Sequence, residues 1–172
     1  MTKTHIIIPP VIIGAATLAG FLIMYLLPAP VPLNVCLKEH NVDSFNLHPR
    51  VQIQVDGKDK FLPADVGINQ KNGRECVHVI HTDQMGDTLH IQFVRPIRLT
   101  MGDFMKLYSA NNSTITVADN SSGKVTYENL TLKNYDIDYS YFTTNGYIPI
   151  ANLTKSPPFT DSFLGRINLR SK

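Results

Sequence analysis

The sequence predicts an all-β fold, β-rich with one short helix, in an extracytoplasmic domain on a single N-terminal transmembrane helix. Three observations predict it. No charged residue lies between Lys3 and Lys38, whereas the whole chain is 17% charged. Beyond this stretch, segments alternate apolar and polar residues, which is the period of a half-buried strand. Thr100 and Asp103 have the spacing of a helix N-cap and its third helical residue, so they predict one helix.

Length and charge exclude several classes of protein. A chain of 172 residues corresponds to one ordinary domain with a segment added. A net charge of +2 without a Lys/Arg run argues against a nucleic-acid-binding protein. Two cysteines are too few for a disulfide-dense scaffold. The sequence also contains no phosphate-binding loop or dinucleotide fingerprint, so we expect the chain not to be catalytic by itself.

Residues 6–27 are predicted to cross the lipid bilayer. These 22 uncharged residues would form a helix of about 33 Å, enough for a hydrocarbon core of about 30 Å. A cleaved signal peptide is the alternative. Its apolar region usually has about 7–15 residues and precedes an A-x-A site, which this sequence lacks. Residues 28–32 contain three prolines and predict a stiff linker. Anchor and linker together are assigned to residues 1–33.

Asn-x-Ser/Thr sequons favour an orientation with the following domain outside the cytoplasm. The alternative is that Asn, Ser and Thr are simply common in this sequence. Sequons suggest that the domain meets a glycosylation machinery, which lies outside the cytoplasm. Together with the one apolar segment, they predict a single-pass protein of the cell membrane with its C-terminal domain outside. The candidate glycosylation sites are Asn111, Asn112, Asn120, Asn129 and Asn152.

The apolar segment also carries small residues at helical spacing. Ala15 and Ala19 are four residues apart, as are Ala16 and Gly20. Small side chains let helices approach closely in lipid, so this face predicts contact with another membrane subunit. Gly and Ala are also frequent in membrane helices without such a role.

Residues 34–150 are predicted to form the β-rich domain. Asp56 and Gly57 are typical of a two-residue hairpin turn after the alternating segment 51–55, with Phe61 and Leu62 on the return strand. A short helix of about two turns should follow Thr100. Residues 151–172 are expected to form an irregular C-terminal tail. The further strands are expected at 77–80, 88–94, 114–118, 130–132, 136–141 and 147–150, with a turn at 120–123.

Cys36 and Cys76 are an even pair in a compartment expected to be oxidising. A disulfide between them is favoured over free or metal-bound thiols. Closing a loop of about forty residues would stabilise the fold by about 2–4 kcal/mol. Cys76 and His78 would share one face of a strand.

Five of the six histidines lie between His40 and His90. Imidazole is the commonest metal ligand in proteins, so histidines on neighbouring strands could converge on one ion. No C-x-x-C or H-E-x-x-H spacing is present. Histidines with a purely structural role are the alternative.

Several motifs resemble a family of small membrane-anchored extracytoplasmic proteins of ammonia-oxidising archaea. The family pattern H-x-H-x-x-L-x-I-x-x-D-G-K aligns with residues 46–58, and P-A-N-I-G-I aligns with 63–68. The pattern C-x-x-x-x-H-T-H-D with a later I-H begins at Cys76, and T-x-G-x-F-F begins at Thr100. The likeness covers roughly residues 36–141.

The resemblance implies a histidine-rich site, which this chain carries in reduced form. Asn46 and Asp83 stand where the family pattern has histidines. His48, His81 and His90 remain, with Asp83 as an oxygen ligand, and such a set suits copper or zinc. The resemblance also implies an accessory, non-catalytic subunit of the archaeal ammonia monooxygenase. A free-standing cell-surface protein that binds or delivers metal is the alternative.

Overall fold

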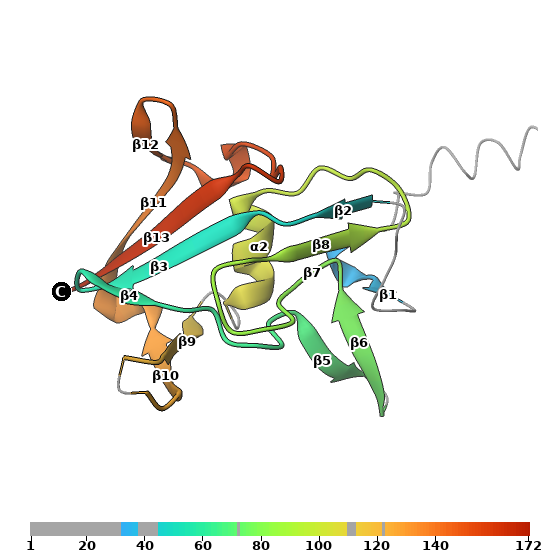
Figure 1. Cartoon of the computed structure of the whole chain (residues 1–172), viewed down its shortest axis with the longest axis horizontal. Coiled ribbons are helices and arrows are strands. Elements are labelled where there is room, and N and C mark those ends of the chain that lie inside the picture. Colours follow the sequence, from blue (N-terminus) through green and yellow to red (C-terminus); the bar gives the residue numbers. More distant parts are fainter. Residues whose placement is uncertain (1–31, 38–44, 72, 110–112, 122) are drawn as a thin grey trace, which may run out of the picture. The chain divides into compact units, whose positions relative to one another are not determined.

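The largest sheet has five strands in the order β12-β11-β13-β3-β4 (Figure 1). This computed structural model describes residues 32–37, 45–71, 73–109, 113–121 and 123–172. Strands β3 and β13 are parallel, and the other neighbouring pairs of this sheet are antiparallel. The strands are β3 (Arg50–Val55), β4 (Lys58–Lys60), β11 (Tyr135–Thr143), β12 (Gly146–Pro149) and β13 (Leu164–Ser171).

The core lies on one face of this sheet. In β3, Val51 and Ile53 are each 1% exposed, while the intervening Gln52 faces the other side and is half-buried. Strand β13 alternates in the same way, with Ile167 and Leu169 fully buried. Because successive side chains of a strand point to opposite faces, these residues meet in one apolar layer.

Helix α2 (Met101–Tyr108) packs on the core face of the sheet (Figure 1). The predicted cap is confirmed: Asp103 N donates to Thr100 Oγ1 at 3.4 Å, and Thr100 N donates to Asp103 Oδ2 at 3.1 Å. Met101 and Phe104 are fully buried. A Cβ atom on Gly165 of β13 would lie 2.3 Å from Met101 Cε. The helix can therefore pack this closely on the sheet because residue 165 is a glycine.

Three smaller sheets complete the compact unit formed by residues 32–172. One has the order β1-β6-β5, the second the order β2-β8-β7, and the third pairs β9 with β10. Between β9 and β10, Gly123 N donates to Asn120 O at 3.2 Å, which confirms the predicted turn. Their bounds are β1 (Cys36–Leu37), β2 (Phe45–Leu47), β5 (Ile68–Lys71), β6 (Arg74–His78), β7 (Ile80–His81), β8 (His90–Phe93), β9 (Thr114–Asp119) and β10 (Thr126–Thr131); the 3-10 turns are η2 (Pro32–Asn34), η3 (Leu132–Asn134) and η4 (Leu153–Lys155).

The expected β-rich class with one short helix is confirmed, but two local expectations are wrong. The chain after Ala151 is not an irregular tail throughout, because β13 lies in the sheet between β11 and β3. Phe61 and Leu62 lie beyond the return strand β4. Phe61 forms an isolated β-bridge with Ala118 of β9 and not with β3. Its backbone N donates to Ala118 O at 2.9 Å.

The predicted membrane segment, residues 6–27, lies outside the described residues. Within the described ranges, no helix has both the length and the apolar character needed to span a membrane.

An ion pair between β4 and β9 is expected to make the folded domain less stable at acid pH. Lys60 Nζ donates to Asp119 Oδ2, and Ser121 N donates to Asp119 Oδ1 at 2.7 Å. The Lys60 hydrogen bond, followed by those from Ser121, holds the pKa of Asp119 well below its usual value near 3.8.

We expect Asp119→Asn to reduce the acid sensitivity of the fold. A carboxyl whose pKa is lower in the native than in the unfolded state stabilises the native state above its unfolded pKa. That stability is lost as pH falls below about 4. Urea unfolding between pH 2 and pH 7 should therefore show a shallower acid decline for the variant, approaching the wild type at the acid end. Asp59→Asn, which removes an exposed carboxylate from the same hairpin, is the control. An unchanged acid decline in Asp119→Asn would contradict the expectation.

Candidate functional site

The histidine cluster is built on a short antiparallel ladder. His81 ends β7, His90 begins β8, and the two residues are direct cross-strand partners. Their rings are stacked with centroids 5.7 Å apart. The side chain of His81 is fully buried, whereas that of His90 is 25% exposed. The ladder thus places one imidazole in the interior and the other at the surface beside it.

Asp83 lies against both imidazoles. His81 Nε2 is 3.3 Å from Asp83 Oδ1, and His90 Nδ1 is 3.5 Å from Asp83 Oδ2. Asp83 lies two residues after His81, the last residue of β7; the intervening Thr82 is buried and donates from its N to Val66 O at 3.0 Å, whereas Asp83 is exposed. One carboxylate therefore faces a nitrogen of each ring.

His48 adds a third ring from another element. It follows β2, and its ring stands edge-on to that of His90, with centroids 5.0 Å apart. Its backbone N donates to Asp161 Oδ1 at 2.8 Å, and its Nδ1 lies 3.8 Å from the same oxygen. The structure therefore brings together all four predicted residues and adds Asp161, which sequence reasoning missed.

The hydrogen bonding of His81 defines its tautomer. His81 Nδ1 lies 2.9 Å from the carbonyl oxygen of His78, which can only accept, so Nδ1 carries the proton. In the neutral ring, Nε2 then directs a lone pair towards Asp83 Oδ1. Two electron-rich atoms at this distance are stabilised by a proton or a cation. A backbone carbonyl that orients one ring nitrogen is also the usual support of a metal-ligating histidine.

The cluster is not a closed metal site in this conformation. Among the described residues, no group of three or more His, Cys, Asp or Glu side chains has the geometry to hold a metal ion. The rings are neighbours, but the acidic side chain that His48 Nδ1 contacts is that of Asp161, at 3.8 Å, whereas Asp83 contacts His81 and His90. Imidazole and carboxylate donors suit zinc or copper(II) chemically. Binding would require His48 and His90 to reorient around the fixed ring of His81.

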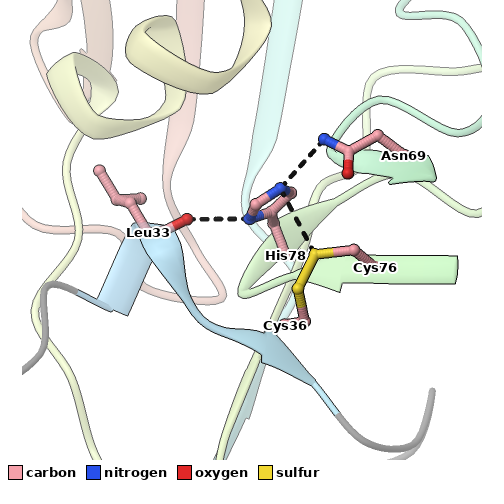
Figure 2. The surroundings of a disulfide bond; sticks show 5 residues. All are labelled: Leu33, Cys36, Asn69, Cys76 and His78. Atoms are coloured by element: carbon pink, nitrogen blue, oxygen red, sulfur yellow. Dashed lines mark hydrogen bonds between the residues drawn. A yellow bond between two sulfur atoms is a disulfide. The ribbon is translucent and has the colours of Figure 1, made fainter. Parts of the chain in front are cut away.

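The predicted disulfide between Cys36 and Cys76 is present. Its Cα atoms are 4.9 Å apart, and the bond closes a loop of 40 residues. Figure 2 shows how it ties β1 to β6, with the ring of His78 beside Cys76 on the same strand. The bond fastens the segment that follows the predicted linker to the body of the domain.

The predicted glycosylation sites differ in their surroundings. Asn120, Asn129 and Asn152 are exposed. Asn152 caps η4, and its Oδ1 accepts hydrogen bonds from Thr154 N at 2.9 Å and Thr154 Oγ1 at 2.7 Å. Asn111 and Asn112 lie outside the described residues.

Sequence spacing could not have identified Asp161 or the contacts of His78. Asp161 is 113 residues from His48 and lies in a stretch expected to be irregular. His78 shares a strand face with Cys76 as expected from spacing, but its contacts with Leu33 and Asn69 depend on how β1 and β5 flank β6.

No protein-family model, curated protein or solved structure matches this chain.

Proposed function

We propose that the chain is a non-catalytic accessory subunit of a membrane-bound complex, with its β domain outside the cytoplasm. The Cys36–Cys76 disulfide carries this proposal. Structural disulfides persist in oxidising compartments, which supports an extracytoplasmic location. The bond begins nine residues after the uncharged segment 6–27, so it lies where an anchored domain meets its tether.

The hairpin β11–β12 supports a contact with a partner protein. Phe142 and Ile148 are 52% and 40% exposed. Phe142 pairs with Tyr147, and Tyr141 pairs with Ile148, so the two exposed residues lie on opposite faces of the hairpin. Strand β12 is also an edge of its sheet, with unpaired backbone groups available to another chain. A hairpin that is apolar on both faces is suited to lie between other protein surfaces.

The complex that we propose is the archaeal ammonia monooxygenase, in the cell membrane. This step rests on the resemblance of residues 36–141 to proteins of ammonia-oxidising archaea. The small-residue face of residues 14–20 would supply the contact within the bilayer.

Mild solubilisation of native membranes tests the subunit role. We expect the chain to migrate in native gels with other membrane proteins. Ala16→Leu with Gly20→Leu should weaken that association, because added bulk prevents close helix approach. Leu22→Ile with Ile23→Leu keeps side-chain volume and is the control. A chain that migrates alone at its own mass would contradict the proposal.

A second candidate function is metal binding at the cell surface, which the contacts of the Asp83 carboxylate with both His81 and His90 favour. We expect full-length protein to take up copper or zinc in elemental analysis, with weaker binding below about pH 6.5, because imidazole ligands must be neutral. His48→Gln with His90→Gln should lower the affinity at least about tenfold.

His78→Gln is the matched control for the metal experiment, since it removes a histidine outside the cluster and leaves the carbonyl that orients His81. A metal content near zero, unchanged after copper or zinc is added, would leave these histidines with a structural role. Metal-loaded protein that migrates alone would favour delivery over the subunit role.

A further inference from the structure

Three arginines lie on the outer face of the five-stranded sheet, the face opposite the core and helix α2 (Figure 1). Arg50 Nε donates to Asp87 Oδ2 at 2.9 Å, and Arg170 Nη2 donates to Asp138 Oδ2 at 2.6 Å. The third, Arg166, lies between them along the strands. It forms no ion pair with a carboxylate of the described ranges. One positive charge of this face is therefore not balanced by a neighbour.

Neutral groups hold the guanidinium of Arg166 in place. Its Nη2 donates to Gln52 Oε1 at 3.1 Å, and its Cζ lies 3.8 Å from the centroid of the Tyr147 ring. The hydroxyl of Tyr147 donates to the same Gln52 oxygen at 2.9 Å. Nε of Arg166 is buried and has no hydrogen-bond partner among the described residues. An amide oxygen and a ring face thus fix the position of the cation without neutralising it.

Further hydrogen-bond donors flank the guanidinium. The strand register places Gln52 of β3 and Ser140 of β11 on either side of Arg166, and all three residues are half-buried. Arg166 Nη1, Gln52 Nε2 and Ser140 Oγ form no hydrogen bond with the described part of the chain, and none of these atoms is buried. Because guanidinium and amide nitrogens can only donate, the group as a whole suits an acceptor with negative charge.

An exposed aromatic ring adjoins these donors. Phe142 lies two residues after Ser140 on the same face of β11 and is 52% exposed. Its ring stands edge-on to that of Tyr147, with centroids 5.2 Å apart. Arginine and aromatic side chains are enriched at the centres of protein–protein interfaces, where they contribute most of the binding energy. The combination is therefore typical of a protein contact.

The charge on this face indicates the chemistry of what binds there. The fork of a guanidinium matches the two oxygens of a carboxylate. Arg166 supplies one unbalanced positive charge, which one carboxylate would neutralise. A phosphate monoester carries nearly two negative charges and would remain undercompensated, since Arg50 and Arg170 are already paired.

We propose that an outer patch formed by Gln52, Ser140, Phe142, Tyr147 and Arg166 docks a partner protein through an acidic side chain. The carboxylate of the partner accepts from Arg166, and an apolar side chain beside it packs on Phe142. This inference rests on the proposed subunit role and deepens it, because it selects one face of the hairpin β11–β12 and names the chemistry that the partner presents.

Photo-crosslinking in native membranes that carry the full-length chain tests the contact. Phe142 is replaced by the photoreactive residue p-benzoylphenylalanine, and the cross-linked peptides are mapped by mass spectrometry. We expect a peptide of another protein with Asp or Glu close to the cross-linked position. Adding Arg166→Gln should lower the yield at least about tenfold, because the partner's carboxylate would be covered without its cation. The same probe at Tyr127, which is 61% exposed on β10, measures the background.

Arg170→Gln is the matched control, since it removes the same charge from the same strand face but at a residue already paired with Asp138. It should leave the yield within about twofold of the unmodified chain. Arg166→Lys keeps the charge without the planar fork and should give an intermediate yield. A yield at Phe142 no higher than at Tyr127, or no loss in Arg166→Gln, would overturn the proposal.

The mapped peptide decides the matter even if Arg166→Gln fails to fold. Cross-links to peptides without an acidic residue, to a second copy of this chain or to lipid alone would also overturn the proposal. Native gels of the same membranes separate its failure from that of the subunit role. A chain that migrates with partners but cross-links at other surfaces keeps the subunit role and excludes this patch, whereas a chain that migrates alone contradicts both.

Discussion

Ile167→Asp is expected to unfold most of the β domain. Ile167 is fully buried in β13 and is paired with Ile53 of β3 and Tyr139 of β11. The change removes an apolar side chain from the core and introduces a carboxylate without a partner. Together these effects should cost about 4 kcal/mol or more, a large part of the 5–15 kcal/mol by which domains are usually stable.

Urea unfolding followed by tyrosine fluorescence measures this loss, because the chain has seven tyrosines and no tryptophan. Asn168→Asp adds the same charge one residue later, on the opposite face of the same strand, and should cost less than about 1 kcal/mol. Equal unfolding midpoints for the two variants would show that β13 does not contribute to the core as its position indicates.

Gly67→Ala is expected to have the second-largest effect. Gly67 has φ +77°, a conformation that costs L-residues about 1–2 kcal/mol. A Cβ atom there would also lie 2.2 Å from the backbone oxygen of Ile80, which cannot move without disrupting β7. Gly67 O in turn accepts from His78 N at 2.9 Å. We therefore expect a loss of about 3 kcal/mol or more in the free energy of unfolding.

Gly57→Ala separates the two causes. Gly57 has nearly the same φ, +76°, but a Cβ atom there would have no atom within 4 Å beyond its own chain neighbours. Its substitution should show the conformational cost alone, about 1 kcal/mol. If the two alanine variants unfold at the same urea concentration, the close contact with Ile80 carries no cost, and the loop is more adaptable than its hydrogen bonds indicate.

Local patterns predicted those elements whose signal lies within a few residues. Alternation in residues 51–55 identified β3, and Asp56-Gly57 identified the turn, where Asp56 and Gly57 both have positive φ. The cap pair Thr100 and Asp103 identified α2, because both cap hydrogen bonds join residues three apart. The disulfide was predictable because only two cysteines are present.

Short strands escaped prediction because they are too short to show a period. Strands β1 and β2 have two and three residues, and each exists through its pairing with a distant strand. Strand β13 was missed for another reason. Arg166 and Asn168 alternate with its buried residues, but the prolines at 157 and 158 favoured an irregular tail.

The candidate site, like the fold, was predictable from the sequence only in part. The amino-acid types of His48, His81, Asp83 and His90 suggested one cluster, and their neighbouring positions in the structure agree with that. Which nitrogen of each ring faces which oxygen depends on the β7–β8 register and on the carbonyl of His78. Neither can be read from spacing, since a register shift of one residue would turn every side chain to the other face.

The sequence by itself determined the β-rich class, the capped helix, the turn at Asp56-Gly57 and the disulfide, because each depends on local backbone preference or on a unique pair of residues. Only the tertiary structure decided that β13 lies between β3 and β11, that Asp161 joins His48, and that Leu33 and Asn69 hold the ring of His78. These three results depend on contacts between segments up to 114 residues apart. Such contacts are selected by the shared burial of apolar faces, which no short stretch of sequence encodes alone.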